Sequence, residues 1–111
     1  MSRSLGAFPA LILMLVPSVL AADAAPASPE ALRKLASDYY RWRNEQYPVF
    51  SSDQGLHTGD GRLTDWSAAA LAARRAHVRR VLEAVRAAKD DAWPKDDRID
   101  AVLFQIGRAH V

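Results

Sequence analysis

Three amphipathic stretches alternate with segments that lack a regular hydrophobic period. In the first stretch, Leu32, Leu35, Tyr39 and Trp42 recur at steps of three and four residues, so that they share one helical face. Charged side chains occupy the other faces. The spacing predicts a helix over about 29–47.

The ends of this helix carry signals of their own. Ser28 can cap the amide groups of the first turn, Pro29 suits the first helical position, and Glu30 complements the positive end of the helix dipole. Pro48 is expected to end the helix, because a residue that precedes proline disfavours the helical conformation.

The second stretch, residues 68–89, consists almost entirely of strong helix formers, and Ser67 is its expected N-cap. Its apolar stripe consists of Leu71, Val78, Leu82 and Val85. Residues 90–94, Asp-Asp-Ala-Trp-Pro, are expected to end it, and a third helix is predicted from Lys95 to Gln105. The apolar residues on one side of this third helix are Ile99, Val102 and Leu103. The predicted fold class is all-α.

Residues 48–66 are predicted to form a loop, because glycines and aspartates alternate there without a period of two or 3.6. Loops of this length in compact domains are usually functional or packed against something else. The segment contains large apolar side chains that a solvated linker would not need: Val49, Phe50, Leu56, Leu63 and Trp66. We therefore expect it to pack against protein.

Residues 1–21 have the layout of a secretory signal peptide, in which Arg3 precedes an apolar run from Leu5 to Leu20. The run is shorter than the about 20 residues of a membrane-spanning helix and contains glycine and proline, so no permanent membrane anchor is expected. Small side chains favour cleavage after Ala21 or Ala22. The segment has no cysteine for lipid attachment and no arginine pair, which leaves the general export route to the periplasm or beyond.

Two further segments are set apart from the helical part of the chain. Residues 22–29 are small and proline-containing, as in a flexible tether. Residues 106–111, Ile-Gly-Arg-Ala-His-Val, can be back-translated into a widely used sequencing-library adapter. We interpret them as an adapter artefact. Residues 30–105 are then expected to be the N-terminal helical part of a larger domain whose gene continues after the codon of Gln105.

Charge and cysteine usage narrow the function classes. The chain has 15 Lys and Arg against 13 Asp and Glu, and the two totals become equal when Arg3 and Arg108 are left out. Arg75, Arg79 and Arg86 lie beside the stripe of the second helix. Without net positive charge or an aromatic stacking pattern, they favour a solvated or paired helix face over nucleic-acid binding. The chain has no cysteine, so disulfides cannot reinforce a small core.

The chain has too few catalytic groups for an enzyme. A zinc peptidase typically combines two histidines one helical turn apart with a carboxylate ligand and a glutamate base. Before the suspected adapter, only His57 and His77 are present, one in the loop and one on a helix. We interpret His77 as a surface residue, His57 as a hydrogen-bond donor that fixes a turn, and Asp60 and Asp65 as turn or capping residues. No catalytic, cofactor-binding or metal-ligating residue is predicted in this part.

Residues 55–74 resemble the signature Gly-x-His-x-x-Asp-x-Arg-Leu-x-Asp-x-Ser-x-x-Ala-x-x-Ala-Arg of exported bacterial proteins catalogued as domain of unknown function 885. Residues 35–42 and the Tyr47-Pro48 pair resemble that family's first helix, and residues 96–100 resemble the opening of its third helix. The resemblance covers about residues 30–105. Gly59 departs from it, since the family often has an aromatic residue there.

The resemblance implies a mostly helical protein of several hundred residues, whose later part carries a His-Glu-x-x-x-x-His-type zinc motif and is metallopeptidase-like. That motif is absent here, so zinc and a peptide substrate are expected only of the full-length protein. The present helices would flank or cover its substrate cleft, with the missing C-terminal part of the same chain as their partner. Two alternatives stay open: a small, self-contained exported interaction module, and a non-catalytic relative that kept the helices and lost the metal.

Overall fold

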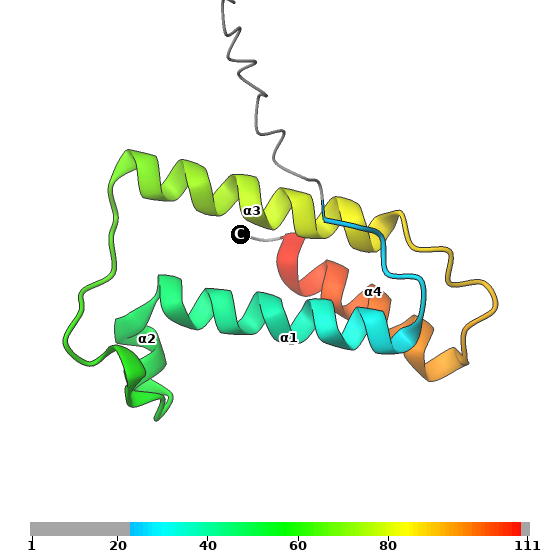
Figure 1. Ribbon diagram of the computed structural model, residues 1–111, viewed down its shortest axis with the longest axis horizontal. Coiled ribbons are helices and arrows are strands. Elements are labelled where there is room, and N and C mark those ends of the chain that lie inside the picture. Colours follow the sequence, from blue (N-terminus) through cyan, green and yellow to red (C-terminus); the bar gives the residue numbers. More distant parts are fainter. Residues whose placement is uncertain (1–22, 110–111) are drawn as a thin grey trace, which may run out of the picture.

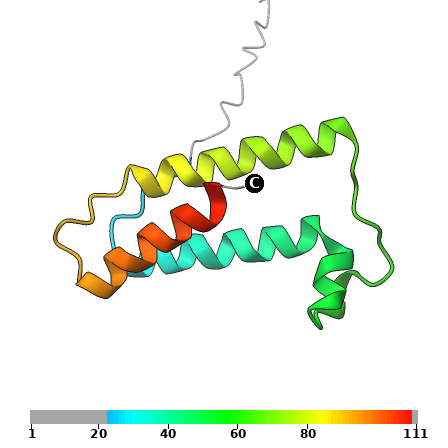
Figure 2. The same cartoon turned by 180° about the vertical axis from the view of Figure 1, so that it is seen from behind.

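A computed structural model describes residues 23–109, and all the regular secondary structure in this range is helical. The long helices α1 (Pro29–Gln46) and α3 (Ala68–Arg86) run antiparallel, and α4 (Lys95–Ala109) crosses them diagonally, behind them in Figure 1 and in front of them in Figure 2. The predicted all-α class is confirmed. The predicted signal peptide with its cleavage site, and the last two residues of the suspected adapter, lie outside the described residues.

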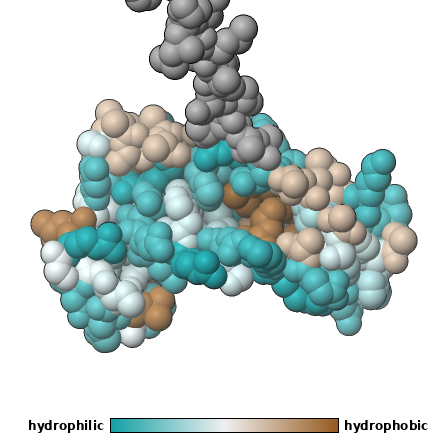
Figure 3. Space-filling model, in the orientation of Figure 1, coloured by the Kyte–Doolittle hydropathy of each residue, from teal (hydrophilic) through white to brown (hydrophobic). Residues whose placement is uncertain are grey.

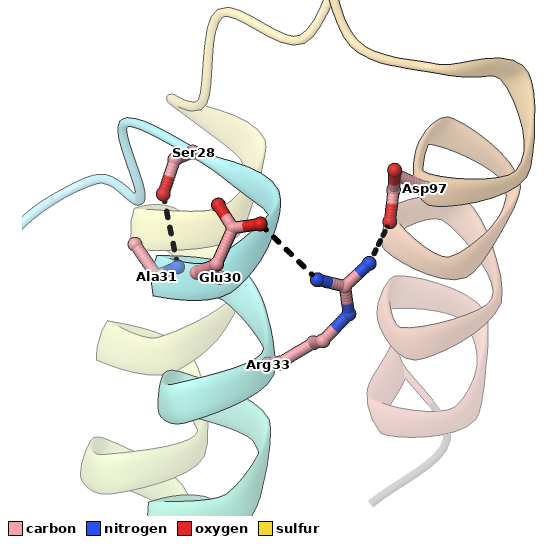
Figure 4. Close-up of polar contacts among 5 residues, drawn as sticks. All are labelled: Ser28, Glu30, Ala31, Arg33 and Asp97. Atoms are coloured by element: carbon pink, nitrogen blue, oxygen red, sulfur yellow. Dashed lines mark hydrogen bonds and ion pairs between the residues drawn. The ribbon is translucent and has the colours of Figure 1, made fainter.

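The first helix has the predicted bounds to within one residue. The Ser28 hydroxyl accepts a hydrogen bond from the Ala31 amide at 3.1 Å, as the expected N-cap. Close by, the Arg33 guanidinium bridges Glu30 and the Asp97 carboxylate of α4 (Figure 4). An ion pair therefore connects the starts of α1 and α4.

The other two long helices begin where the sequence predicts and end elsewhere. The Ser67 hydroxyl caps α3 by accepting from the Ala70 amide at 3.2 Å. The helix ends at Arg86 instead of Lys89, because the Ala88 amide bonds to the Val85 carbonyl, three residues back, in a tighter final turn. α4 begins at Lys95 and continues beyond the predicted Gln105 to Ala109.

The core lies where the three long helices meet. Leu32, Val85 and Ala101 form one buried cluster, with one residue from each long helix. A second cluster brings together Tyr39 of α1 with Val78 and Val81 of α3. Leu35 and Phe104 pack against both clusters. The predicted apolar face of α1 is thus the face that is buried.

The apolar side predicted for the third helix is not the side that packs inward. Ala101 is 1% exposed, whereas Ile99, Val102 and Leu103 are 45%, 51% and 59% exposed. The small Ala101 side chain lets α4 approach the other helices closely, and Phe104 fills the space next to it. α4 is apolar on two sides, and the side with the larger residues faces away from the other helices.

The prediction of a structureless loop over residues 48–66 is wrong in its first half. Pro48–Asp53 forms α2 and His57–Gly59 a single 3-10 turn, η1. Pro48 favours a helix start, and the buried Ser51 hydroxyl bonds to the Asn44 carbonyl at 2.8 Å, which joins α2 to the end of α1. These elements are too short to produce a hydrophobic period.

Within residues 23–109, none of the helices has the length and apolar character needed to cross a membrane.

Candidate functional site

An open groove of about 610 Å³ lies at the end of the molecule where α1 meets α2. Trp42 and Tyr47 contribute from the end of α1, Phe50 from α2, and Leu63 and Trp66 from the segment before α3. The volume is in the range of ligand pockets, which are lined mainly by apolar and aromatic side chains with a few polar groups. The sequence predicted no binding site here.

The apolar side chains around this groove are exposed. Leu63 is 88% exposed and Trp66 is 65% exposed. Val49 and Phe50 are partly exposed, at 45% and 42%. Figure 3 shows strongly apolar residues at the end of the molecule formed by α2 and the segment that follows it. The expected packing of this segment against protein is therefore not provided by the described part of the chain.

Arg74 lies behind the groove and is buried, with 4% of its surface exposed. Its Nη2 donates a hydrogen bond to the Gln46 carbonyl at 3.1 Å, at the negative end of α1. Its guanidinium carbon lies 4.8 Å from the centroid of the Tyr47 ring and 5.7 Å from that of Trp66, within range of a cation–π interaction. Nε and Nη1 have no hydrogen-bond partner among residues 23–109.

Further charges lie close to the groove. The Arg43 guanidinium is 4.7 Å from the Phe50 ring centroid, and Asp53 is on the groove wall. Asp65 accepts a hydrogen bond from the Ser67 amide at 2.8 Å, and this bond, followed by the more distant charge of Arg74, lowers the pKa of its carboxyl. Asp65 thus makes the turn contact expected of it.

The structure places His57 in η1 beside Asp60. His57 Nδ1 lies 3.0 Å from one oxygen of the Asp60 carboxylate, and the Ser52 hydroxyl donates to the other oxygen at 2.5 Å. The hydrogen bond from Ser52, more than the proximity of His57, lowers the pKa of Asp60. Asp60 therefore joins the turn to α2 through Ser52, and His57 contacts the same carboxylate within the turn, as expected of a histidine that fixes a turn.

The interpretation of His77 as a plain surface residue is wrong. Its ring centroid lies 4.0 Å from that of Trp42, and its ring is nearly parallel to that of Tyr39 at 6.4 Å. Partial burial, followed by the positive charge of Arg80, lowers its pKa below the usual 6.5. The side chain is a packed partner of α1, because the aromatic face of that helix extends far enough to cover it.

The two histidines do not belong to one site. In the range 23–109, no three His, Cys, Asp or Glu side chains are grouped so that they could hold a metal ion. The exposed arginines Arg75, Arg79 and Arg86 make no ion pair with a described residue, so this helix face is solvated.

Two residues of the groove region were missed by the sequence analysis. Arg74 falls one turn before Val78 in the register of the buried stripe, a position from which a buried arginine could have been inferred. Gly59 is buried against Pro48, where an added Cβ would lie only 2.8 Å from the proline Cβ. The absence of a side chain at Gly59 therefore allows η1 to pack closely against α2.

The chain matches no protein-family model, no curated protein and no solved structure.

Proposed function

We propose that residues 30–105 form the N-terminal, non-catalytic helical part of a larger exported hydrolase of the zinc-peptidase type. The observation that carries the proposal is the apolar surface that the described residues leave uncovered. Ile99, Val102 and Leu103 form a stripe on the outer side of α4 with exposures of 45% to 59%. Contiguous apolar surface of this kind is typical of faces that other protein covers.

The chemical class comes from the sequence. The signature over residues 55–74 resembles exported metallopeptidase-like proteins, and the histidine, aspartate and arginine of that signature all lie at the α2 end of the molecule. In this proposal the zinc ligands and the glutamate base belong to later segments of the full chain. The present helices support or border the cleft that receives a peptide.

Export is part of the same proposal. An apolar run that is short and interrupted directs secretion and is then removed, so the mature protein begins near Ala22 or Asp23 and acts in the periplasm or outside the cell. Mass spectrometry of the protein expressed in a bacterial host tests this step. Recovery of intact chain from the inner membrane would show that the segment is an anchor instead.

The decisive experiment is to sequence the source gene beyond the codon of Gln105 and to express the complete reading frame. We expect a frame that continues for several hundred codons, a product that cleaves peptides, and loss of this cleavage on addition of a chelator. The isolated fragment should show no peptidase activity and no rise in melting temperature with zinc, since residues 23–109 contain no preformed group of ligands that would bind the metal in the folded state. A stop codon directly after the codon of Val111 would overturn the proposal.

One observation favours a second candidate, a self-contained exported interaction module. α1, α3 and α4 share a buried cluster, Leu32, Val85 and Ala101, without help from further segments. Such a module would fold alone and use its exposed apolar faces to bind another protein. It predicts a reading frame that ends close to Val111, which separates it from the hydrolase.

A further inference from the structure

Arg74 differs from the other arginines of α3 in its surroundings. Among the charged residues of the described range it alone is buried. Burial removes water from a charge, and in folded proteins a buried charge is normally paired. The described ion pairs involve Glu30, Asp38, Asp60 and Asp97, and none of them includes Arg74. The hydrogen bonds from Ser67 and, less strongly, the charge of Arg74 lower the pKa of Asp65, but the Asp65 and Arg74 side chains form no ion pair.

The partners that Arg74 does have leave part of its donor capacity unused. The Gln46 carbonyl takes one N–H group, and the Tyr47 and Trp66 rings offer their negative faces without accepting a conventional hydrogen bond. Nε and Nη1 point at no acceptor within residues 23–109. An acceptor of negative charge would complete this set of contacts.

The groove lies next to this cluster. Tyr47 and Trp66 contact Arg74 and also form part of the groove wall. Trp66 is 65% exposed and lies in a segment without regular secondary structure, so its ring can turn outward with little loss of packing. That rotation would connect the guanidinium to an apolar space of about 610 Å³.

We propose that this groove binds the C-terminal residue of a peptide that ends in an apolar side chain. The terminal carboxylate accepts hydrogen bonds from the N–H groups of Arg74 that have no partner, after Trp66 has rotated. The last side chain lies among Tyr47, Phe50 and Leu63. This binding does not depend on the hydrolase assignment, and it can be measured on the chain itself.

Groove length favours a peptide over a small organic acid. The lining extends from Trp66 beside Arg74 to Tyr39 and Val78 further along the long helices, so the residue before the terminal one has room as well. Thr64 and Asp53 on the wall offer polar groups to the backbone amides of this preceding residue. A small apolar acid would use only the Arg74 end.

The test is calorimetric titration of the processed chain with three probes: acetyl-Ala-Phe with a free carboxylate, the same compound as a C-terminal amide, and 3-phenylpropionate. We expect the peptide acid to bind about tenfold or more tightly than the amide, the size of effect expected of a charge-assisted hydrogen bond. We also expect it to bind more tightly than 3-phenylpropionate. Equal binding of acid and amide, equal binding of peptide acid and 3-phenylpropionate, or no binding of any probe would overturn the proposal.

Two variants and a control locate the site. Arg74→Gln should abolish the preference for acid over amide, and Arg75→Gln, which alters an exposed neighbour, should retain it. If Arg74→Gln fails to fold, Trp66→Ala decides, because an exposed side chain can be removed without loss of the core. Trp66→Ala should keep the acid preference and associate with the peptide acid faster. Loss of the acid preference in Trp66→Ala, or its retention in folded Arg74→Gln, contradicts the site.

Discussion

The two ends of the helical unit differ in which side chains they bury: one buries apolar residues and exposes its arginine, and the other buries its arginine and exposes apolar residues. Where α1 and α4 begin, the exposed Arg33 pairs with Glu30 and Asp97 (Figure 4). Leu32, at the same end, is buried in the core. Where α1 meets α2, the buried Arg74 has no carboxylate partner among the described residues, and Trp66 is exposed. At this second end the charge is inside and the apolar surface outside.

The difference shows which end is complete in itself. An exposed ion pair adds little stability, but the apolar cluster beside it buries its side chains in full. An uncovered tryptophan beside a buried, unpaired guanidinium is costly in isolation, and such a cost is usually retained where a partner or ligand removes it. The first end therefore holds the fold together, and the second end carries the groove for which a ligand is proposed above.

The largest difference in stability between the two ends is expected when one leucine at each end is replaced by alanine. Leu32→Ala should lower the free energy of unfolding by about 2–5 kcal/mol, because it leaves a cavity beside Val85 and Ala101. Leu63→Ala should change it by no more than about 0.5 kcal/mol, since that side chain is 88% exposed. Urea unfolding followed by circular dichroism measures both. Similar losses for the two variants would mean that the groove end is covered in solution.

A second comparison uses two glycines of the groove end. Gly59→Ala brings a Cβ to 2.8 Å from the Pro48 Cβ and should cost about 1–3 kcal/mol through overpacking. Gly61→Ala meets no atom within 4 Å and should be neutral or slightly stabilising, because alanine restricts the unfolded chain. Thermal melts of both variants provide the measurement. If Gly59→Ala melts like the original protein, then η1 is not held against α2.

The long elements could be predicted because their signals are repeated and local. Ser28 and Ser67 act as caps in the predicted places, and the α1 stripe repeats over several turns, so that a single misplaced residue does not hide it. α2 escaped prediction because six residues contain less than two helical turns. Its stability comes from Ser51, whose hydroxyl bonds to the end of α1, and this is a tertiary contact without a sequence period.

The site could not be predicted, for a different reason. Histidines and aspartates are the usual candidates for a functional site in a sequence. Here, however, His57 and Asp60 stabilise a turn, and His77 packs on Trp42. Burial of Arg74 follows from the position of α3 against the end of α1, and sequence alone shows only that it shares a face with Val78. The inner face of α4 was missed because its buried residue is an alanine, which carries little hydrophobic signal.

Removing the N-cap hydroxyl of α1 or α3 should have a smaller effect on stability. Ser28→Ala should lower the free energy of unfolding by about 1 kcal/mol, because the start of α1 belongs to the packed end. Ser67→Ala removes an equivalent bond from the exposed start of α3, so its main result should be faster amide exchange at Ala70 and Leu71, with about half that loss of stability. Hydrogen exchange read by NMR distinguishes local fraying from global unfolding. Equal global losses would show that α3 is as tightly held at its start as α1.

The smallest expected effect is a pH dependence that originates at His77, midway between the two ends. Burial against Trp42, and then the charge of Arg80, lower the pKa of His77, so the folded state binds its proton less readily than the unfolded state. Asp23 acts in the opposite direction, and Lys34, Asp38 and Tyr39 line the same pocket.

The direction of the effect follows from proton uptake. Above the usual His77 pKa of 6.5 the side chain is neutral in both states and adds no pH dependence. As the pH falls below 6.5, the unfolded chain takes up the proton first, so the protein loses stability until the lowered pKa of the folded state is passed. Asp38, Asp60 and Asp65 have lowered pKa values too, but their contribution is lost only below the usual carboxyl value of 3.8. Urea midpoints between pH 7 and 5 should therefore decline less in His77→Gln than in the original protein, and parallel curves would show that the imidazole is not buried against Trp42.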